Sequence, residues 1–557
     1  MAVNVLIAET IHQAGIDRLR GEPGIVMHIM PDTAGPEELA ERLARCRYEA
    51  LIVRSKTKVT GELLAKAPHL KVVGRAGVGV DNIDVPAATR RGILVVNAPG
   101  ANTTSTAEHT IAMMLALARR IPAACGSMKA GRWQRQQFMG TQLAGKTLGI
   151  LGLGRIGREV AKRAAALGMN LLGYDPLLTP DMAHRLGVVL SSVDEICSQA
   201  DFITVHTPLT AKTKGLIDRD KFAGMKKGIY IINCARGGII DEEALLEALN
   251  DGRVAGAALD VMVHEPPPAN HPLVNHPNVV VTPHLGASTE EAQADAAVEV
   301  AEAVLAALDG RPVRSAVNGP YLRGLLQDKK GYLDLCERLG ALFTNLYNGG
   351  YHHLEITYAG EAAEIDSEAM TTILLKGLLA PLTPEVNYIN AGLLAEERGF
   401  VIRESKSSKS AGYTNLVMIR ASVDDVDSAG FGAASSESAA GSGGAAGAAD
   451  LPAIRTLAAH LTAEGKRRLT DIDGYSLHVE EQGMMIIARN QDKPGMIGKV
   501  GTVLGRHGIN ISFMQVGRKR IGDLAVMVIG IDQPLTAEAL SDLRSLPDLY
   551  DVRVAAW

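Results

Sequence analysis

Cysteine, aromatic side chains and net charge are all scarce in this chain of 557 residues, and each shortage excludes a class of protein. The five cysteines lie far apart and form no CxxC pair, which argues against a disulfide framework and a zinc site, so we expect no metal. Aromatic residues make up 4% of the chain, too few for a surface that stacks single-stranded nucleic acid. The formal net charge of −5 argues against a nucleic-acid partner and against a polybasic membrane surface.

A basic leader and long apolar runs are also lacking. Residues 1–9 carry no positive side chain before their apolar run, so they are predicted to form a first strand rather than a signal peptide. The longest apolar run, around 111–118, is far shorter than the roughly 20 residues that span a bilayer. Together with the unpaired cysteines, these features predict a cytoplasmic protein in a reducing compartment.

Glycine and aliphatic residues, in contrast, are abundant: the chain has 58 glycines and is 46% hydrophobic. This composition suits an α/β protein with many tight turns between strands and helices. Before residue 100, strand-like apolar runs alternate with helical patterns, which predicts parallel βαβ units. A second series begins at Lys146, and its six strand-like runs match a doubly wound sheet. These runs are 147–151, 170–174, 202–205, 229–233, 257–261 and 279–282.

The C-terminal part of the chain is organised differently. Residues 318–475 have a mixed α/β pattern, and within them 428–450 are almost wholly Ser, Gly and Ala. That composition cannot bury a core, so we interpret 428–450 as a flexible surface insert. Residues 484–557 give strand, helix, strand, strand, helix and strand, which is the ferredoxin-like βαββαβ pattern.

A glycine-rich turn follows the first strand of the second series. Gly152, Gly154 and Gly157 form GxGxxG between an apolar strand and a predicted helix, where glycines let the backbone approach a pyrophosphate. Asp175 ends the next strand, 23 residues after the first glycine, where a carboxylate accepts hydrogen bonds from ribose hydroxyls. Its charge would repel a 2′-phosphate, so the motif predicts NAD rather than NADP. The alternatives are a packing role for the glycines and a turn-forming role for Asp175.

Three further groups with catalytic chemistry follow consecutive strands of the same series. Arg236 follows the fourth strand, Glu265 the fifth and His284 the sixth. Because doubly wound sheets bind ligands at the carboxyl ends of their strands, we expect these side chains to converge.

Together the three groups suit the oxidation of a 2-hydroxy acid, in which a base takes the hydroxyl proton while a hydride leaves the same carbon. His284 can take the proton, Glu265 can orient the imidazole, and Arg236 can bind the carboxylate and polarise the developing carbonyl. Singly, each has an ordinary alternative: a surface-loop histidine, a turn glutamate and an ion-paired or helix-capping arginine.

These motifs resemble the D-isomer-specific 2-hydroxyacid dehydrogenases, and the likeness covers nearly the whole chain. It rests on VRS (53–55), GRAGVGVDNID (74–84), GILGLGRIG (149–157), NCARGG (233–238), ALDV (258–261) and PHLGAST (283–289). The resemblance implies that Arg236, Glu265 and His284 are catalytic. It also implies cofactor contacts from Gly152, Gly154, Arg155, Ile156, Gly157, Asp175, Thr207, Cys234 and Asp260. One departure is Met262, where the family usually has Phe, and it puts only local packing in doubt.

The resemblance also implies a division into domains. A flavodoxin-like substrate-binding domain combines 1–98 with 287–317, and a Rossmann NAD-binding domain, 99–286, is inserted in it. An intervening regulatory domain, 318–475, and an ACT regulatory domain, 484–557, follow.

The same likeness implies which residues meet the substrate. Arg54 and Arg75 also suit a phosphate or carboxylate on chemical grounds, although each can be a solvated surface arginine. The segment around Trp133 resembles one that reaches the neighbouring subunit's active site, which implies at least a homodimer. The implied substrate contacts are Arg54, Ser55, Arg75, Gly77, Val78, Asn102, Trp133 and Arg135.

The ACT-like tail carries a second set of candidates. ACT domains pair edge to edge and bind amino acids between them, and the likeness implies that Asn490, Asp492 and Asn510 hold L-serine. ACT pairing of two dimers makes a homotetramer the expected assembly. The alternative is an ACT fold that only joins subunits. The basic run 466–468 of the intervening domain suits an anion, and equally suits a solvated charged face.

The implied activity is NAD-dependent oxidation of D-3-phosphoglycerate to 3-phosphohydroxypyruvate, the first step of L-serine synthesis, under control by serine. One alternative is a reductase of glyoxylate or hydroxypyruvate, which Asp175 and the ACT-like tail disfavour. Another is a transcriptional corepressor of the same fold, which the tail and the pair Arg54 and Arg75 disfavour.

Overall fold

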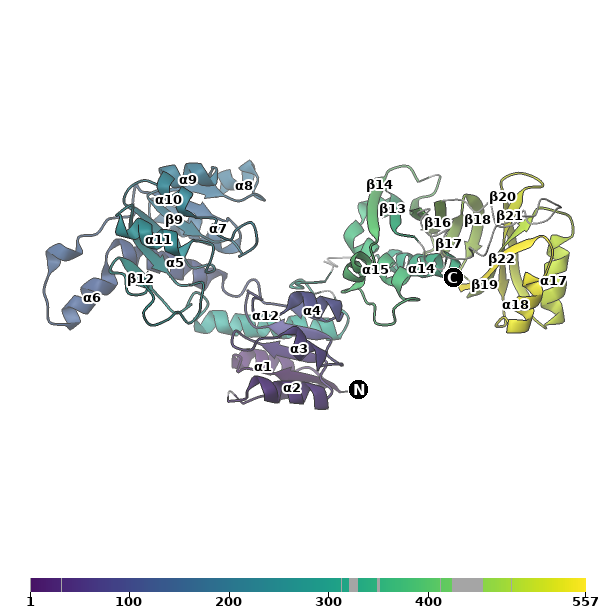
Figure 1. Cartoon of the computed structure of the whole chain (residues 1–557), viewed down its shortest axis with the longest axis horizontal. Coiled ribbons are helices and arrows are strands. Elements are labelled where there is room, and N and C mark those ends of the chain that lie inside the picture. The colour runs from purple at the N-terminus through teal and green to yellow at the C-terminus, as the bar shows by residue number, and fades with distance from the viewer. Residues whose placement is uncertain are drawn as a thin grey trace, which may run out of the picture.

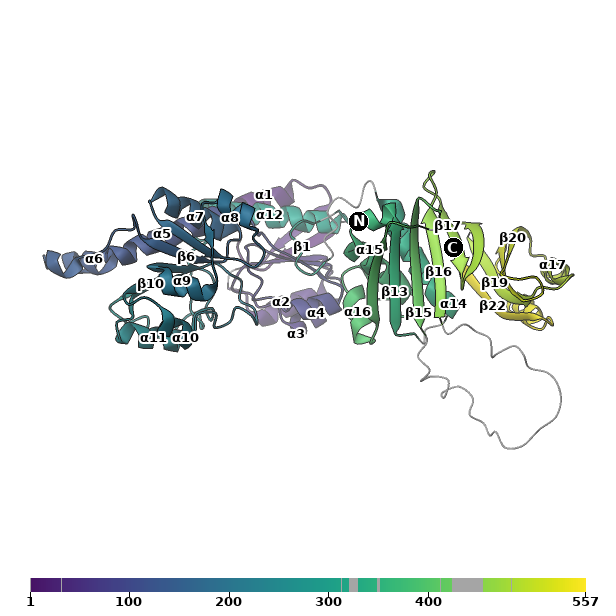
Figure 2. The same ribbon diagram turned by 90° about the horizontal axis from the view of Figure 1, so that it is seen from above.

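The computed structural model describes residues 2–31, 33–311, 313–319, 329–347, 351–410, 412–422, 454–481 and 483–557. The predicted insert, 428–450, lies outside the described residues. Within these ranges the chain forms four β-sheets. In Figures 1 and 2 the second sheet and its helices lie at one end of the molecule, the first sheet in the middle, and the third and fourth sheets at the other end.

The first sheet is wholly parallel, with the order β2-β1-β3-β4-β5. This is the flavodoxin-like order that the sequence led us to expect. Because the order reverses between β1 and β3, the loops after the strands diverge and leave room for a ligand. The strands are β1 (Val3–Ile7), β2 (Ile25–Ile29), β3 (Ala50–Val53), β4 (Val72–Arg75) and β5 (Leu94–Val96).

Helices cover both faces of the first sheet (Figure 2). One of them, α12, comes from far along the chain, and its Val300 and Val304 lie against Gly74. A Cβ at Gly74 would lie 2.7–2.8 Å from their methyl groups, so glycine permits this packing. This lobe is therefore closed by a late segment of the chain. One face carries α1 (Gln13–Arg20) and α12 (Glu290–Leu308), and the other α2 (Pro36–Arg45), α3 (Gly61–Ala65) and α4 (Val85–Arg90).

The second sheet is also parallel, with the order β12-β11-β10-β9-β6-β7-β8, the doubly wound arrangement. All six expected strands are present, and the two-residue strand β8 is added at one edge. The strands are β6 (Thr147–Leu151), β7 (Asn170–Tyr174), β8 (Val189–Leu190), β9 (Phe202–Val205), β10 (Ile229–Asn233), β11 (Val254–Leu259) and β12 (Val279–Val281).

Helices pack on both faces of the second sheet as well. α5 and α7 bury apolar residues on one face, and α9, α10 and α11 do so on the other. α5 matters most for the site, because its first residue follows Asn102 beside the first lobe and the rest of the helix runs along the second sheet. Their bounds are α5 (Thr103–Ala118), α7 (Arg155–Ala166), α9 (Val193–Gln199), α10 (Arg219–Gly224) and α11 (Glu242–Asn250).

The third sheet is mixed, with the order β14-β13-β15-β16-β17-β18, and only β13 and β14 are parallel among its described strands. Three helices accompany it, and α14 and α15 supply much of its core. The strands are β13 (His353–Gly360), β14 (Val401–Ser407), β15 (Asn415–Ser422), β16 (Ile454–Leu461), β17 (Arg467–Ile472) and β18 (Tyr475–Glu480), and the helices are α14 (Lys330–Tyr347), α15 (Ser367–Leu379) and α16 (Ala391–Glu397).

The fourth sheet is antiparallel, with the order β20-β21-β19-β22, and has the expected ferredoxin-like βαββαβ sequence of elements. Its side chains Met485, Val528 and Trp557 belong to the same buried cluster as Leu342 and Leu457 of the third sheet unit. The two C-terminal sheets therefore share one hydrophobic core. The elements are β19 (Met484–Gln491), α17 (Met496–Arg506), β20 (Ile511–Arg518), β21 (Leu524–Ile531), α18 (Ala537–Arg544) and β22 (Leu549–Ala556).

A loop of the third unit docks on the first lobe. Asn387 Nδ2 donates to Gly92 O at 2.9 Å, and Asn390 Nδ2 donates to Arg90 O at 3.4 Å. A Cβ at Gly92 would overlap the Asn387 amide, so glycine permits the contact. Ile389, which is 8% exposed, packs into the core of the first lobe. The C-terminal units are thus attached to the lobe that carries β1–β5.

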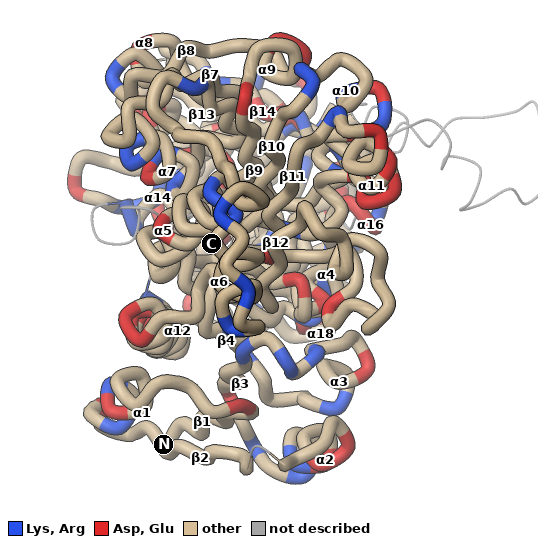
Figure 3. The backbone as a smooth tube through the Cα atoms, turned by 90° about the vertical axis from the view of Figure 1, so that its left-hand side faces the viewer, with Lys and Arg blue, Asp and Glu red and all other residues tan. Residues whose placement is uncertain are grey.

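Charges of both signs are interspersed along the chain in Figure 3. Among the described residues no single helix is long and apolar enough to cross a membrane. One bent pair, α5 with α6 (Ile121–Lys129), passes that test by length and composition alone, with a 64° angle between its helices.

The crossing of α14 and α15 depends on two glycines, and this generates a stability prediction. A Cβ at Gly377 would overlap Glu337 O, and one at Gly340 would overlap Leu374 O. We predict that Gly377→Ala lowers the free energy of unfolding of this unit by about 1–3 kcal/mol, because the helices must move apart. A lower midpoint of thermal unfolding checks it.

The matched control is Gly392→Ala in α16, where an added Cβ meets nothing within 4 Å. That change should leave the midpoint unchanged or raise it slightly, since alanine favours helix. An equal loss in both variants would contradict the close-packing explanation.

Candidate active site

A cleft of about 330 Å³ lies between the first lobe and the carboxyl ends of the second sheet's strands. It gathers residues that the sequence places far apart. From the first lobe and the start of α5 come Arg54, Ser55, Arg75, Gly77, Val78 and Asn102, and from the second sheet's loops come Arg236, Glu265 and His284. The structure therefore brings the three catalytic candidates together with six of the eight substrate candidates.

A histidine–carboxylate pair stands at one wall of the cleft. His284 Nδ1 lies 2.8 Å from Glu265 Oε2, so the ring donates its Nδ1–H and keeps a lone pair on Nε2. Glu265 Oε1 accepts the N–H of Met262 at 3.1 Å. Burial raises the pKa of Glu265, but these hydrogen bonds outweigh it and hold the pKa below its usual value. The carboxylate is therefore ionised at neutral pH and fixes the imidazole in one tautomer.

Arg236 connects the second sheet to the first lobe. It follows β10, and its Nε donates to Asp81 Oδ2 at 3.2 Å, on the loop after β4. A Cβ at Gly79 would overlap the Arg236 guanidinium, so glycine permits this approach. Arg236 Nη1 also donates to Ala235 O at 2.6 Å. These contacts hold the guanidinium across the cleft.

Arg75 faces the same space as Arg236. Burial, and then the neighbouring Arg236 charge, lower the pKa of Arg75. Its Nε is buried without a hydrogen-bond partner among the described residues, and so is Asn102 Oδ1. Two cations held near each other, with an unsatisfied donor, are typical of a site that binds an anion.

Arg54 stands on the loop after β3. Its Nη1 donates to Thr10 O at 3.3 Å, and its backbone N–H donates to Glu9 Oε1 at 3.1 Å. Glu9 also accepts the N–H groups of Lys56 and Thr57, so one carboxylate shapes this loop. The loop thereby aims Ser55 and Arg54 at the cleft.

The glycine-rich turn fits a pyrophosphate. Gly152 has φ +99°, and a Cβ there would lie 2.7 Å from His206 O. A Cβ at Gly157 would overlap Gly152 O, whereas one at Gly154 would meet nothing within 4 Å. Gly152 and Gly157 are thus packed against neighbouring backbone, whereas the space beside Gly154 is open. Helix α7, which starts here, has no side-chain cap. Free N–H groups at such a helix start bind anions.

Asp175 stands beside this turn at the end of β7. Its Oδ2 accepts Leu153 N–H at 2.8 Å, and its Oδ1 accepts Leu177 N–H at 2.9 Å. Both bonds orient the carboxylate and leave further lone pairs for ribose hydroxyls. Arg155 and Ile156 begin α7, next to the open space.

Two buried polar atoms follow β9 without partners among the described residues: Thr207 Oγ1 and His206 Nδ1. Burial lowers the pKa of His206 to about 4, so this ring is neutral. Thr207 was a cofactor candidate and His206 was not. The unsatisfied hydroxyl of Thr207 supports a polar ligand here. The open glycine turn, the uncapped start of α7 and these unpaired polar atoms together form a site whose chemistry fits NAD.

Cys234 and Asp260 are buried at the ends of β10 and β11. Burial, and then Asp260, raise the pKa of the Cys234 thiol to about 12, so the thiol stays neutral. The Asp260 carboxylate is directed at the loop 282–286, and its part in cofactor binding stays a prediction. His109 of α5 contacts this carboxylate. His109 was not among the site candidates, because nothing in its local sequence pattern separates it from a surface histidine.

Trp133 and Arg135 lie outside the cleft of their own chain. They follow α6, which projects away from the second sheet (Figure 1). Large apolar side chains are exposed along this arm, with Met139 82% and Trp133 74% exposed.

The serine candidates are not together within one chain. Asn490 and Asp492 lie at the end of β19 that pairs with the start of β21. Asn510 precedes β20, next to Asp532 at the other end of β21. Asn490 Oδ1 is buried without a partner among the described residues.

The basic run 466–468 of the third unit is neutralised by carboxylates. Arg467 pairs with Glu481, and Arg468 with Glu480. Lys466 lies 3.4 Å from Glu464. These ion pairs favour the alternative of a charged surface face over the anion cluster.

Three family models match the chain. They are the D-isomer specific 2-hydroxyacid dehydrogenase NAD binding domain over residues 111–286, the D-3-phosphoglycerate dehydrogenase intervening domain over 329–439, and the ACT domain over 484–548.

Relatives match over almost the full length. D-3-phosphoglycerate dehydrogenase of Archaeoglobus fulgidus is 42% identical over 99% of this chain and 99% of its own length. The protein of the same name from Bacillus subtilis is 43% identical over 91% of this chain and 92% of its own. Among solved structures, D-lactate dehydrogenase of Aquifex aeolicus, complexed with NAD and lactic acid, has a TM-score of 0.50 and 30% identity. The match covers 57% of this chain and all of that one.

The position of Asp175 generates a prediction about cofactor choice. Asp175→Asn keeps an oxygen for Leu153 N–H but removes the charge that repels a 2′-phosphate. We expect the affinity for NADPH to rise roughly tenfold, or about 1.4 kcal/mol, relative to NADH. Fluorescence titration of both cofactors measures this ratio, with Asp181→Asn, an exposed acid on α8 (Pro180–Arg185), as the control. An unchanged ratio in Asp175→Asn would rule out this role.

Proposed function

Because the chain belongs to the D-3-phosphoglycerate dehydrogenase family of D-isomer-specific 2-hydroxyacid dehydrogenases, we propose that its cleft oxidises D-3-phosphoglycerate to 3-phosphohydroxypyruvate with NAD. The observation that carries this proposal is the His284–Glu265 pair, which faces Arg236 and Arg75 across one cleft. The names of the full-length relatives support the same substrate.

The chemistry follows from the tautomer of His284. Since Nδ1–H is donated to Glu265, the free Nε2 accepts the proton of the substrate's C2 hydroxyl. The ionised Glu265 stabilises the imidazolium that forms. Arg236 binds the C1 carboxylate and polarises the C2 oxygen as the C=O bond develops. Loss of the proton and of a hydride from C2 gives the 2-oxo acid.

NAD, when bound, supplies the carbon that accepts this hydride. The turn 152–157 and the start of α7 would hold its pyrophosphate, and Asp175 would hold its ribose. Closure of the two lobes excludes water from the hydride path.

The cations of the first lobe distinguish this substrate from smaller ones. A 2-oxo acid such as glyoxylate has one carboxylate, which Arg236 alone can bind. Arg54 and Arg75 add two guanidinium groups to the same cleft. A phosphorylated substrate uses this additional positive charge, and a glyoxylate or hydroxypyruvate reductase has no need of it.

The division of the chain into domains is proposed with the function. The substrate-binding domain is 1–98 with 287–317, the NAD-binding domain 99–286, the intervening domain 318–475 and the ACT domain 484–557. All five cysteines are free, which supports a reducing cytoplasm as the location.

The assembly is proposed to be at least a homodimer. The arm around α6 exposes Ile121, Met128, Trp133 and Met139, an amount of apolar surface that a partner chain would cover. Such a contact would bring Trp133 and Arg135 to the neighbouring cleft. Pairing of ACT domains would join two dimers into a tetramer.

Serine is proposed as the effector bound by the ACT domain. Asp492 would meet the ammonium group of serine, and Asn490 offers a buried, unsatisfied amide oxygen. Because Asn510 lies at the opposite end of β21, it would come from a second copy of the chain. The site is therefore incomplete in one subunit.

The activity is tested by NADH formation from D-3-phosphoglycerate and NAD, with the product removed. We expect turnover in the native chain and a fall of roughly 10²–10⁴-fold in kcat for His284→Ala, because the base is lost. NADH binding should change less than about twofold, since His284 does not hold the dinucleotide turn. His184→Ala, an exposed histidine of α8, is the control.

Two results would overturn the assignment. Full activity of His284→Ala would remove its role as the base. Reduction of glyoxylate or hydroxypyruvate without turnover of D-3-phosphoglycerate would replace the proposed substrate.

The two-copy serine site is tested by complementation. Asp492→Ala and Asn510→Ala should each raise the serine concentration needed for half inhibition by roughly tenfold or more, because each removes polar contacts to serine. In mixed assemblies of the two variants, one of the two sites combines the intact Asp492 and the intact Asn510. Co-expressed, doubly tagged mixtures should therefore recover part of the inhibition.

Asp542→Ala, an exposed acid of α18, is the control. If the mixed assemblies are as insensitive as the single variants, all three residues cannot serve one site shared between two chains.

A further inference from the structure

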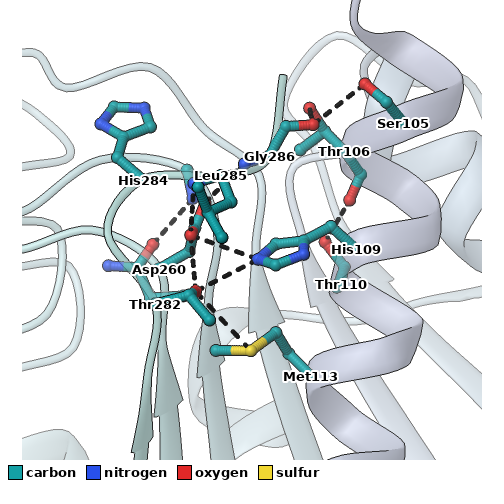
Figure 4. Close-up of polar contacts among 12 residues, drawn as sticks. Ser105, Thr106, His109, Thr110, Met113, Asp260, Thr282, His284, Leu285 and Gly286 are labelled. Atoms are coloured by element: carbon teal, nitrogen blue, oxygen red, sulfur yellow. Dashed lines mark hydrogen bonds and ion pairs between the residues drawn. The ribbon is translucent and has the colours of Figure 1, made fainter. Parts of the chain in front are cut away.

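The carboxylate of Asp260 is surrounded by the loop that carries the base (Figure 4). Asp260 is 2% exposed at the end of β11. Its Oδ1 accepts Leu285 N–H at 2.7 Å and the Thr282 hydroxyl at 2.6 Å, and its Oδ2 accepts Gly286 N–H at 2.9 Å. One buried carboxylate therefore holds three residues of the loop 282–286 through hydrogen bonds.

His284 lies within this loop and needs such support. Its backbone N–H donates to Asp260 O at 2.9 Å, and its φ is +56°, in the left-handed region that side-chain-bearing residues avoid. The surroundings must therefore hold this backbone in place. The imidazole itself points away from Asp260 (Figure 4), so Asp260 acts on the base through the backbone.

His109 reaches the same carboxylate from α5. Its Nε2 lies 3.2 Å from both Asp260 Oδ1 and Thr282 Oγ1. The one hydroxyl hydrogen of Thr282 is committed to Asp260 at 2.6 Å, so both oxygens face His109 with lone pairs. His109 must therefore carry its hydrogen on Nε2 and donate it to them.

The electrostatics support this arrangement. Burial raises the pKa of Asp260, and the hydrogen bond from His109 is the largest of the contacts that bring it down to about 2. α5 also holds the far end of the loop, because Ser105 and Thr106 donate to Gly286 O at 2.9 and 3.0 Å. One polar face of α5 thus contacts the loop at both ends.

We infer that His109 is a positioning residue for the base: its Nε2–H fixes Asp260 and Thr282, and these in turn hold the backbone of His284 for proton transfer. This inference rests on the proposed function, since it assigns His109 a role through His284. It adds a residue of the interdomain helix α5 to the machinery of the reaction.

Two substitutions at position 109 distinguish a hydrogen-bond donor at the Nε2 position from a side chain that is only polar. Gln at position 109 can place its amide nitrogen near the Nε2 position, whereas Asn is too short and places it near Nδ1. We expect His109→Asn to lower kcat about tenfold and His109→Gln to recover most of that loss. KM for D-3-phosphoglycerate should change less than about twofold in both, because no substrate contact is altered.

His507→Leu is the matched control. His507 pairs with Asp542 at 2.8 Å, and its side chain is 21% exposed, against 20% for His109. It lies in the ACT domain, so kcat should not change.

A second measurement does not depend on turnover. Hydrogen exchange of a peptide that contains Leu285 and Gly286 should quicken in His109→Asn but not in His109→Gln or His507→Leu, because both amides donate to Asp260. Lower kcat together with faster exchange in His109→Asn supports the inference. Equal kcat in the Asn and Gln variants, or unchanged exchange in His109→Asn, overturns it. If the native chain does not turn over D-3-phosphoglycerate, the proposed function fails, and the exchange experiment still decides the role of His109.

Discussion

A carboxylate buried at the end of a parallel strand must be surrounded by donors, and in this protein that requirement organises the active site. Asp260 lies among N–H and O–H groups of the loop after β12, and burial makes the loss of any donor costly. The loop can therefore adopt the left-handed backbone at His284, which is unfavourable in isolation. Glu265 then orients the projecting imidazole from the neighbouring loop.

An arginine that follows a strand of the second sheet contacts the first lobe across the cleft. Arg236 crosses from the second sheet to Asp81, and the glycines at 77 and 79 leave room for the Arg75 and Arg236 guanidinium groups. Positive charge is therefore concentrated in a small cleft and favours an anionic substrate, and burial, followed by the Arg236 charge, lowers the pKa of Arg75. The first lobe supplies Arg54, Arg75 and the small residues, and the second sheet supplies Arg236, so the shape and charge of the cleft depend on both.

The two C-terminal units form one packed body, which contacts the rest of the chain at the first lobe. The third and fourth sheets share a hydrophobic core that includes Trp557 and Leu342, so the ACT domain is packed directly against the third-sheet unit. The contact with the catalytic half runs from Asn387 and Asn390 to the turn before β5. The shared core and these contacts connect the ACT domain to the lobe that carries Arg54 and Arg75.

The sequence by itself determined the two parallel sheets, the ACT-like tail, and the residues that follow each strand of the doubly wound sheet. Strand periodicity and glycine spacing are local properties, and the ends of parallel strands necessarily share one edge, so Arg236, Glu265 and His284 could be brought together without coordinates.

Only the tertiary structure decided which way a buried group points and what it meets. His109 contacts Asp260 from a helix more than a hundred residues away, the run 466–468 faces carboxylates, and Asn510 lies at the wrong end of its sheet to join Asn490. These pairings depend on how distant elements pack, because hydrogen bonds and ion pairs need contact within a few ångströms, which sequence spacing does not specify.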